Sequence, residues 1–354
     1  MIKFSDLLEV DAEDNIDEVV PKRIPIKHKT PWTDKYRPTK LDDIAYQTEV
    51  VKMLKNTLLT GNLPHLLFYG PAGTGKTSSI LAIAMELFGP KIFKERVIEL
   101  NASDERGINV VRNKIVRFAK SAIGTKDPDY PCPNYKIIIL DEADAMTTEA
   151  QSALRKVMED NSSITRFCFI CNYINQIIEP ITSRCVKFRF KPLSKNSMFE
   201  RLKFIMEKER VSVPDDALMA ITDMSEGDMR KGIMLLQNLK YIKEPITVQH
   251  VHELSGAIPP AIVTIITKIC MNKKRNSIEN ITILAKNIIA DAYPIHNIIN
   301  CLCNLVVNSK SISDFNKAQI MLHLSLVEKR LNDGSDEYLQ LLSVLVYIKK
   351  FSKD

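Results

Sequence analysis

Five short runs of apolar residues alternate with helix-forming segments in the first half of the chain. The runs are rich in Ile, Val, Leu and Phe and are apolar at consecutive positions, which is typical of strands covered on both faces of a parallel sheet. They span residues 65–70, 96–100, 135–140, 166–171 and 185–190. The pattern predicts an α/β domain over residues 32–190, in which helices cover both faces of a parallel sheet.

Strand patterns stop after Pro192, and helical periodicity replaces them. Helical segments separated by proline and glycine predict a small helical domain over residues 191–254. Further helical spacing of apolar residues predicts a second, all-helical domain over residues 255–354. Residues 1–31 show no periodicity and combine an acidic run with a basic one, so we expect a flexible N-terminal arm there.

Composition and charge narrow the class of protein. The chain has 354 residues, of which 45% are hydrophobic and 26% charged, so it is globular and neither fibrous nor wholly disordered. No apolar run is long enough to span a membrane, and the acidic N-terminus is unlike a signal peptide, so we expect an intracellular protein without membrane contact. The net charge is +6, with a balance of −6 in residues 1–20, so residues 21–354 carry +12. A basic body attracts polyanions, although proteins without such partners carry similar charge.

A glycine-rich loop follows the first predicted strand and precedes a helical segment. The loop and the first residue after it are Gly70, Pro71, Ala72, Gly73, Thr74, Gly75, Lys76, Thr77 and Ser78. The pattern G-x-x-x-x-G-K-T between a strand and a helix is typical of a phosphate-binding loop. We expect backbone N–H groups to face the phosphates, Lys76 to reach the β- and γ-phosphates, and the Thr77 hydroxyl to bind Mg²⁺.

Polar residues follow the third and fourth predicted strands. Asp141 and Glu142 end the third strand, and Asn172 ends the fourth. Beside a phosphate loop, we expect Asp141 to hold magnesium through water and Glu142 to orient and polarise the attacking water. We expect Asn172 to position that water or to sense the γ-phosphate.

Phosphoryl transfer also needs positive charge at the γ-phosphate. Arg184 precedes the fifth predicted strand, and Arg230 begins a helix of the small helical domain. Both arginines are candidates for this charge, and each taken singly is also compatible with a solvated cap at the end of an element.

Several motifs occur in a fixed order along the chain. They are Trp32-x-x-Lys35-Tyr36-Arg37-Pro38, the loop at 70–77, LNASDERG at 100–107, DEAD at 141–144, Ser183-Arg184-Cys185 and Gly227-Asp228-x-Arg230. Through these motifs residues 32–255 resemble the small subunits of replication factor C, the eukaryotic sliding-clamp loader of the AAA+ class. The segments 130–136 and 169–173 are most similar to the small-subunit type numbered two in one naming system and four in another. The loop has Pro71-Ala72 where relatives commonly have two prolines, and we expect phosphate binding to be unaffected.

The resemblance implies an AAA+ domain, a helical lid and a C-terminal collar that oligomerises, with ATP as the nucleotide. It implies that Trp32, Tyr36, Arg37 and Pro38 line the adenine pocket. It further implies that Arg230 touches the chain's own ATP from the lid, whereas Arg184 reaches the ATP site of the adjacent subunit. The implied partners are the other subunits of a hetero-pentamer, the ring-shaped clamp PCNA and primer–template DNA, and the implied location is the nucleus.

Two predicted helices have a basic outer face. One follows Gly107 and the other spans residues 148–159. Such faces are often merely solvated, but in the clamp-loader family the equivalent helices follow the DNA backbone, which implies sequence-independent, salt-sensitive contacts. The candidate DNA-binding residues are Arg106, Arg112, Arg155 and Lys156.

These features together predict an ATPase, stimulated by DNA and by the clamp, that opens the clamp and loads it during replication and repair. A non-hydrolysing subunit that binds nucleotide as a brace is an alternative, which the intact Lys76, Asp141 and Glu142 disfavour. A DEAD-type RNA helicase shares the loop and the tetrapeptide at 141–144, but it needs a second sheet domain after residue 190. A subunit shared with an alternative loader fits the sequence equally well.

Overall fold

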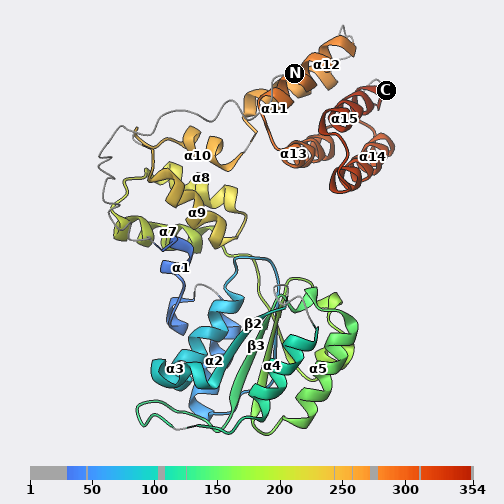
Figure 1. The fold of residues 1–354 in the computed structure, drawn as a ribbon. Coiled ribbons are helices and arrows are strands. Elements are labelled where there is room, and N and C mark those ends of the chain that lie inside the picture. The colour runs from blue at the N-terminus through green and yellow to red at the C-terminus, as the bar shows by residue number, and fades with distance from the viewer. Residues whose placement is uncertain are drawn as a thin grey trace, which may run out of the picture.

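The computed structural model describes residues 30–351, apart from residues 45–46, 103–107, 125, 243, 257, 272–277 and 311. Figure 1 shows three units in succession, namely a sheet domain, a small helical domain next to it, and a C-terminal helical bundle. We call the two helical units the lid and the collar. The N-terminal arm predicted over residues 1–31 lies outside the described residues, except for Thr30 and Pro31.

Five parallel strands form one sheet in the order β2-β3-β4-β1-β5. The strands are β1 (Leu66–Tyr69), β2 (Val97–Asn101), β3 (Lys136–Asp141), β4 (Thr165–Cys171) and β5 (Val186–Arg189). Each strand overlaps one of the predicted apolar runs, to within one residue at its ends, so the predicted parallel sheet is confirmed. Because all five strands are parallel, the polar residues that follow them meet at one edge of the sheet.

The two faces of the sheet carry separate cores. Ile137 and Ile139 of β3 pack on the face covered by α2 and α3, whereas Ile138 and Leu140 pack on the face covered by α4 and α5 (Figure 1). These alternating contacts explain why the strands are apolar at consecutive positions. The covering helices are α2 (Thr48–Thr60), α3 (Lys76–Arg96), α4 (Ile108–Lys120) and α5 (Thr148–Asp160), with a short α6 (Glu179–Thr182) before β5.

The lid has its own core, and the first helix of the chain belongs to it. The lid helices are α7 (Lys195–Glu209), α8 (Asp215–Ser225), α9 (Met229–Leu239) and α10 (Val248–Ser255). The short helix α1 (Trp32–Lys35) packs on α9 although it precedes the sheet in sequence (Figure 1). Trp32 is only 6% exposed and lies in the lid core with Leu202 and Leu236.

In the described residues the collar is a bundle of five helices around an apolar core of its own. The helices are α11 (Pro260–Met271), α12 (Ile278–Ala290), α13 (Ile295–Asn308), α14 (Asp314–Asn332) and α15 (Glu337–Phe351). Beyond residue 190 the described part of the chain contains helices and no strand, so the second sheet that an RNA helicase needs is not found there. Among the described helices none is both long enough and apolar enough to cross a membrane.

The chain crosses the seam between sheet and lid twice. It runs from α1 into the sheet domain, and it returns to the lid after Phe190. Gln47 ties the second crossing to the sheet domain, because its Nε2 donates a hydrogen bond to the carbonyl of Lys191 at 2.9 Å and its Oε1 accepts one from the Lys191 N–H at 3.5 Å. Gln47 is 7% exposed, so these bonds are shielded from water.

Candidate nucleotide site at the seam between sheet and lid

The loop between β1 and α3 forms one wall of a cavity of about 580 Å³. α3 begins at Lys76, directly after Gly75, whose φ is 92°. The first N–H groups of a helix lack partners within it, so this helix N-terminus attracts phosphate. Gly73 has a φ of 66°, and a Cβ there would lie 1.7 Å from Asp228 Oδ1. Only glycine fits where the loop approaches the lid this closely.

Lys76 is held inside the cavity by three acceptors. Its Nζ donates hydrogen bonds to the carbonyls of Gly70 at 2.7 Å and Pro71 at 2.8 Å, and to Asn172 Oδ1 at 3.1 Å. The residue is 8% exposed. Burial lowers the pKa of Lys76, and the carboxylate of Asp141 partly opposes that shift.

Two carboxylates follow β3 at the same edge of the sheet. Asp141 Oδ2 accepts a hydrogen bond from the Thr77 hydroxyl at 2.6 Å, and Asp141 Oδ1 accepts one from the Glu142 N–H at 2.9 Å. Glu142 lines the cavity and has a left-handed φ of 53°. Such a backbone is uncommon outside glycine and is found where surrounding structure enforces it. It turns the Glu142 side chain out of the strand direction and leaves it exposed at the cavity.

Asp144 fixes the end of β4. Its Oδ2 accepts hydrogen bonds from the backbone N–H groups of Asn172 at 2.9 Å and Tyr173 at 3.2 Å. These bonds place the Asn172 side chain against Lys76. The role of Asp144 was not predicted from the sequence, where its only signal is its place as the last residue of the DEAD motif.

The lid closes the cavity from the opposite side. Arg230, at the start of α9, lines the cavity together with Met229. The Met229 N–H donates to the Gly73 carbonyl at 3.3 Å, so the lid is bonded directly to the phosphate loop. Asp228 caps α9 by accepting hydrogen bonds from the N–H groups of Arg230 and Lys231. The structure thus brings Arg230 to the same cavity as Lys76.

The segment after α1 forms a further wall. Tyr36, Arg37 and Pro38 line the cavity, as the family resemblance implies. Trp32 is not among the lining residues: its side chain is buried in the lid core, and its backbone N–H donates to Gln237 Oε1 at 2.9 Å. Its implied contact with the nucleotide stays a prediction, and the structure gives the indole a further role, because its burial in the lid core anchors α1 to the lid. Arg201 of α7, which sequence patterns did not single out, lines the cavity and donates from Nη2 to the Tyr36 carbonyl at 3.1 Å.

Arg184 lies away from this cavity. Its Nη2 forms an ion pair with Glu159 Oε1 at 2.6 Å, and its Nη1 donates to the Pro180 carbonyl at 2.7 Å. Glu159 also pairs with Arg155 Nε at 3.0 Å. The hydrogen bond from Arg155, together with the charge of Arg184, lowers the pKa of Glu159. Arg184 is thus held at an exposed position on the surface of the sheet domain.

The candidate DNA-binding residues are only partly described. Arg155 and Lys156 are exposed on α5, while Leu154 and Val157 of the same helix are buried, as the periodicity predicts. Arg106 lies outside the described residues, and so does the side chain of Arg112.

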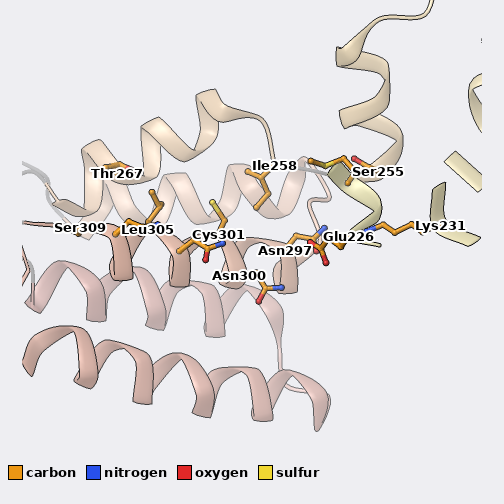
Figure 2. Close-up of a pocket in the computed structure, with 13 residues that line it drawn as sticks. Glu226, Lys231, Ser255, Ile258, Thr267, Asn297, Asn300, Cys301, Leu305 and Ser309 are labelled. Carbon is orange, nitrogen blue, oxygen red and sulfur yellow. The ribbon is translucent and has the colours of Figure 1, made fainter. Parts of the chain in front are cut away.

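A second cavity, of about 600 Å³, lies between the lid and the collar (Figure 2). Its charged lining residues are Glu226 and Lys231 of the lid. The collar side is lined by α11 and by a row of asparagines on α13, namely Asn297, Asn300, Asn304 and Asn308. This cavity shares none of its lining residues with the first.

Three family models match successive parts of the chain. Residues 66–193 match the ATPase family associated with various cellular activities, residues 200–240 match the RCF1/5-like AAA+ ATPase lid domain, and residues 258–347 match the replication factor C C-terminal domain. The three matches follow the sheet domain, the lid and the collar in order.

Curated relatives match nearly the whole chain. Replication factor C subunit 2 of Schizosaccharomyces pombe is 48% identical over 321 residues, which cover 90% of this chain and 94% of the relative. Replication factor C subunit 4 of Homo sapiens is 47% identical over 317 residues, which cover 89% of this chain and 86% of the relative. Among solved structures, the Thermotoga maritima RuvB Holliday junction branch migration motor has a TM-score of 0.50, with 18% identity, over 72% of this chain and 85% of that chain. This last likeness shows a shared fold alone.

Proposed function

We propose, on the premise that this chain belongs to the replication factor C family of AAA+ subunits, that it binds and hydrolyses ATP at the seam between sheet and lid to drive clamp loading. One observation carries the proposal. The buried Lys76, the Thr77–Asp141 pair and Arg230 converge on one cavity from the sheet domain and from the lid. A ligand with several negative charges is complementary to the positive groups in this cavity, and because they come from both domains, its binding joins the sheet domain to the lid.

The phosphate end of the nucleotide is assigned to the loop and to the edge of the sheet. The N-terminus of α3 and Lys76 bind the β- and γ-phosphates, and Arg230 adds positive charge from the lid. Glu142, exposed at the cavity, holds and polarises the attacking water. Asn172, fixed by Asp144, positions that water against the γ-phosphate.

Two side chains are assigned to magnesium: the Thr77 hydroxyl would bind the ion, and Asp141 would hold it through water. Their hydroxyl and carboxylate oxygens lie 2.6 Å apart beside the phosphate loop, and hard oxygen donors of this kind suit Mg²⁺. When bound, the ion neutralises charge on the β- and γ-phosphates. Asp141 is kept in place by its second hydrogen bond, from the N–H of Glu142.

Arg184 is assigned to the ATP site of the adjacent subunit. It does not line its own cavity, and Glu159 and the Pro180 carbonyl hold it at the surface. An arginine supplied by a neighbour makes hydrolysis depend on assembly. Arg184→Ala is expected to leave ATP binding by the isolated chain unchanged and to lower turnover in the complex. Weaker ATP binding by the isolated chain would contradict the assignment.

The partners proposed are the other loader subunits, the clamp PCNA and primer–template DNA, and the proposed site of action is the nucleus. Arg155 and Lys156 are exposed on α5 and available to DNA phosphates. Arg155→Ala is expected to weaken binding of all DNA sequences similarly and to reduce the salt slope of the affinity by about one. A sequence-dependent loss would argue against a phosphate contact.

The central test uses two variants of the full chain. Lys76→Ala is expected to weaken magnesium-dependent ATP binding by about a hundred-fold, because it removes the buried charge that meets the phosphates. Glu142→Gln is expected to bind ATP normally. Within the assembled complex it is expected to release less phosphate in a single turnover, and the loss should equal the contribution of this one ATP site. Normal ATP binding by Lys76→Ala would overturn the proposal. Normal phosphate release and loading by Glu142→Gln would favour the brace that binds without hydrolysis.

A further inference from the structure

Glu209, the last residue of α7, joins α1 to the lid. Its carboxylate accepts hydrogen bonds from three side chains. Lys35 Nζ and Tyr36 Oη donate from the α1 segment, Tyr36 at 2.8 Å, and Lys240 Nζ donates at 2.9 Å from the end of α9. The Glu209 side chain is 9% exposed. Hydrogen bonds from Lys35 first, and then from Lys240 and Tyr36, lower the pKa of Glu209 to about 2. The carboxylate is therefore charged and neutralises two lysines at one point.

Other contacts fix the same segment to the lid. Lys240 Nζ lies 5.0 Å from the centre of the Trp32 ring, so the lysine that bonds Glu209 also covers the indole buried in the lid core. Arg201 holds the Tyr36 carbonyl from α7. α1 and the residue after it therefore move with the lid.

The segment held in this way also forms part of the cavity wall. Tyr36 is bonded to Glu209 through its hydroxyl, and Tyr36, Arg37 and Pro38 line the cavity. Lys76 and the loop line the other end. Glu209 itself is not a lining residue, so any effect it has on a ligand passes through Tyr36 and its neighbours.

We propose that Glu209 is a positioning residue for the base end of the nucleotide, which holds Tyr36, Arg37 and Pro38 in the geometry that receives the base. This inference rests on the proposed function. Replacing the carboxylate by the neutral amide of glutamine leaves Lys35 and Lys240 as two unneutralised cations that repel each other, and it leaves one oxygen in place of two to accept from the three donors. The wall at the base end then shifts, whereas the phosphate loop keeps all of its contacts.

The test compares two ligands on the full chain carrying Glu209→Gln. ATP with magnesium contacts both ends of the cavity, whereas inorganic tripolyphosphate with magnesium contacts only the phosphate end. We expect Glu209→Gln to weaken ATP binding by about ten-fold and to leave tripolyphosphate binding unchanged. A small displacement of the wall at the base end affects contacts with the base, which tripolyphosphate lacks. In the assembled complex we expect a higher KM for ATP with an unchanged kcat.

Glu207→Gln is the matched control, because Glu207 is an exposed carboxylate in the same turn of α7. It is expected to bind both ligands as the wild type does. Tyr36→Phe removes one of the three bonds without leaving an unpaired charge, and we expect a loss of about three-fold for ATP alone. This variant tests the inference should Glu209→Gln fail to fold.

Two outcomes overturn the inference. One is unchanged ATP binding by Glu209→Gln and Tyr36→Phe, and the other is an equal loss for ATP and tripolyphosphate, which indicates a general failure of lid closure. Wild-type chain that does not bind ATP would instead overturn the proposed function. The two failures are therefore distinguishable in one set of measurements.

Discussion

The two cavities of this chain have almost the same volume and very different linings. The cavity between sheet and lid, of about 580 Å³, is lined by the buried Lys76, by Arg230, by carboxylates that include Asp141 and Glu142, and by the N-terminus of a long helix. The cavity between lid and collar, of about 600 Å³, is lined on α13 by a row of neutral asparagines. Carboxamides donate and accept hydrogen bonds equally well but supply no charge to balance a triphosphate. Volume therefore does not make a phosphate site, whereas converging charge and a helix N-terminus do.

The largest effect of a single substitution on the first cavity is expected at Gly73, where the phosphate loop meets the lid. Gly73→Ala is expected to weaken ATP binding by about ten-fold or more, because the new Cβ would lie 1.7 Å from Asp228 Oδ1 and must displace the loop or the lid. The measurement is equilibrium binding of ATP with magnesium. Gly61→Ala is the control, since Gly61 has the same φ of +66° but no atom within 4 Å of a Cβ. It is expected to cost about 1 kcal/mol of stability and to leave ATP binding unchanged.

Asp144 tests whether the end of β4 must be fixed for catalysis. Asp144→Ala removes the acceptor for the N–H groups of Asn172 and Tyr173. A hydrogen bond to a charged group contributes about 1.5 kcal/mol, so we expect turnover to fall by about ten-fold with little change in KM. A larger change in KM than in kcat would show that Asp144 acts on binding instead. Asp144→Asn keeps the size and is expected to recover part of the rate.

The dependence of Tm on pH in the acidic range compares the charge of Glu209 with that of an exposed carboxylate beside the second cavity. The pKa of Glu209 is about 2 in the folded chain and 4.5 ordinarily, so the folded state holds fewer protons than the unfolded state between these values. The stabilisation is present above pH 4.5 and is lost as the pH falls toward 2. We expect the difference in Tm between wild type and Glu209→Gln to shrink from neutral pH to about pH 3.

The matched variant for this measurement is Glu226→Gln, which lies at the second cavity. Its Tm difference from wild type is expected to be the same at both pH values. A Glu209→Gln difference that stays constant with pH would contradict the role assigned to the Glu209 charge.

The smallest effect is expected at the second cavity. Asn304 is exposed on α13, and Asn304→Ala is expected to leave ATP binding unchanged and stability within about 0.5 kcal/mol of wild type. ATP titration and thermal unfolding check both expectations. Weaker ATP binding in this variant would show that the two cavities are coupled through the lid.

The features that the sequence predicted correctly are the local ones. The runs at β1, β3 and β4 became strands that are buried along most of their length, because the helices cover both faces of the sheet there, whereas the run at β5 became a mostly exposed edge strand. The G-x-x-x-x-G-K-T loop became the turn into α3 because its glycines permit positive φ. The side chains that follow β3 and β4 meet because parallel strands end at one edge of the sheet. These relations depend on residues close together in the chain or on the direction of neighbouring strands.

The features that were missed depend on pairs far apart in the chain. Glu209 bonds Lys35 and Tyr36 across separations of 174 and 173 residues, and no periodicity along the sequence reports such a pair. Arg201 reaches Tyr36 across 165 residues, for the same reason. The resemblance implied that Trp32 lies at the nucleotide, but no local pattern indicated that its indole packs into the core of the lid with residues more than 160 positions away.

The double crossing between sheet and lid has a mechanical consequence. A domain joined by a single linker can swing and twist in any direction, but a domain joined at two points turns easily only about the line through them. The chain enters the sheet domain after Tyr36 and leaves it at Lys191, where Gln47 clasps the backbone. The lid therefore rotates mainly about one hinge axis, and the part of the chain farthest from that axis moves along a single arc each time the seam opens or closes.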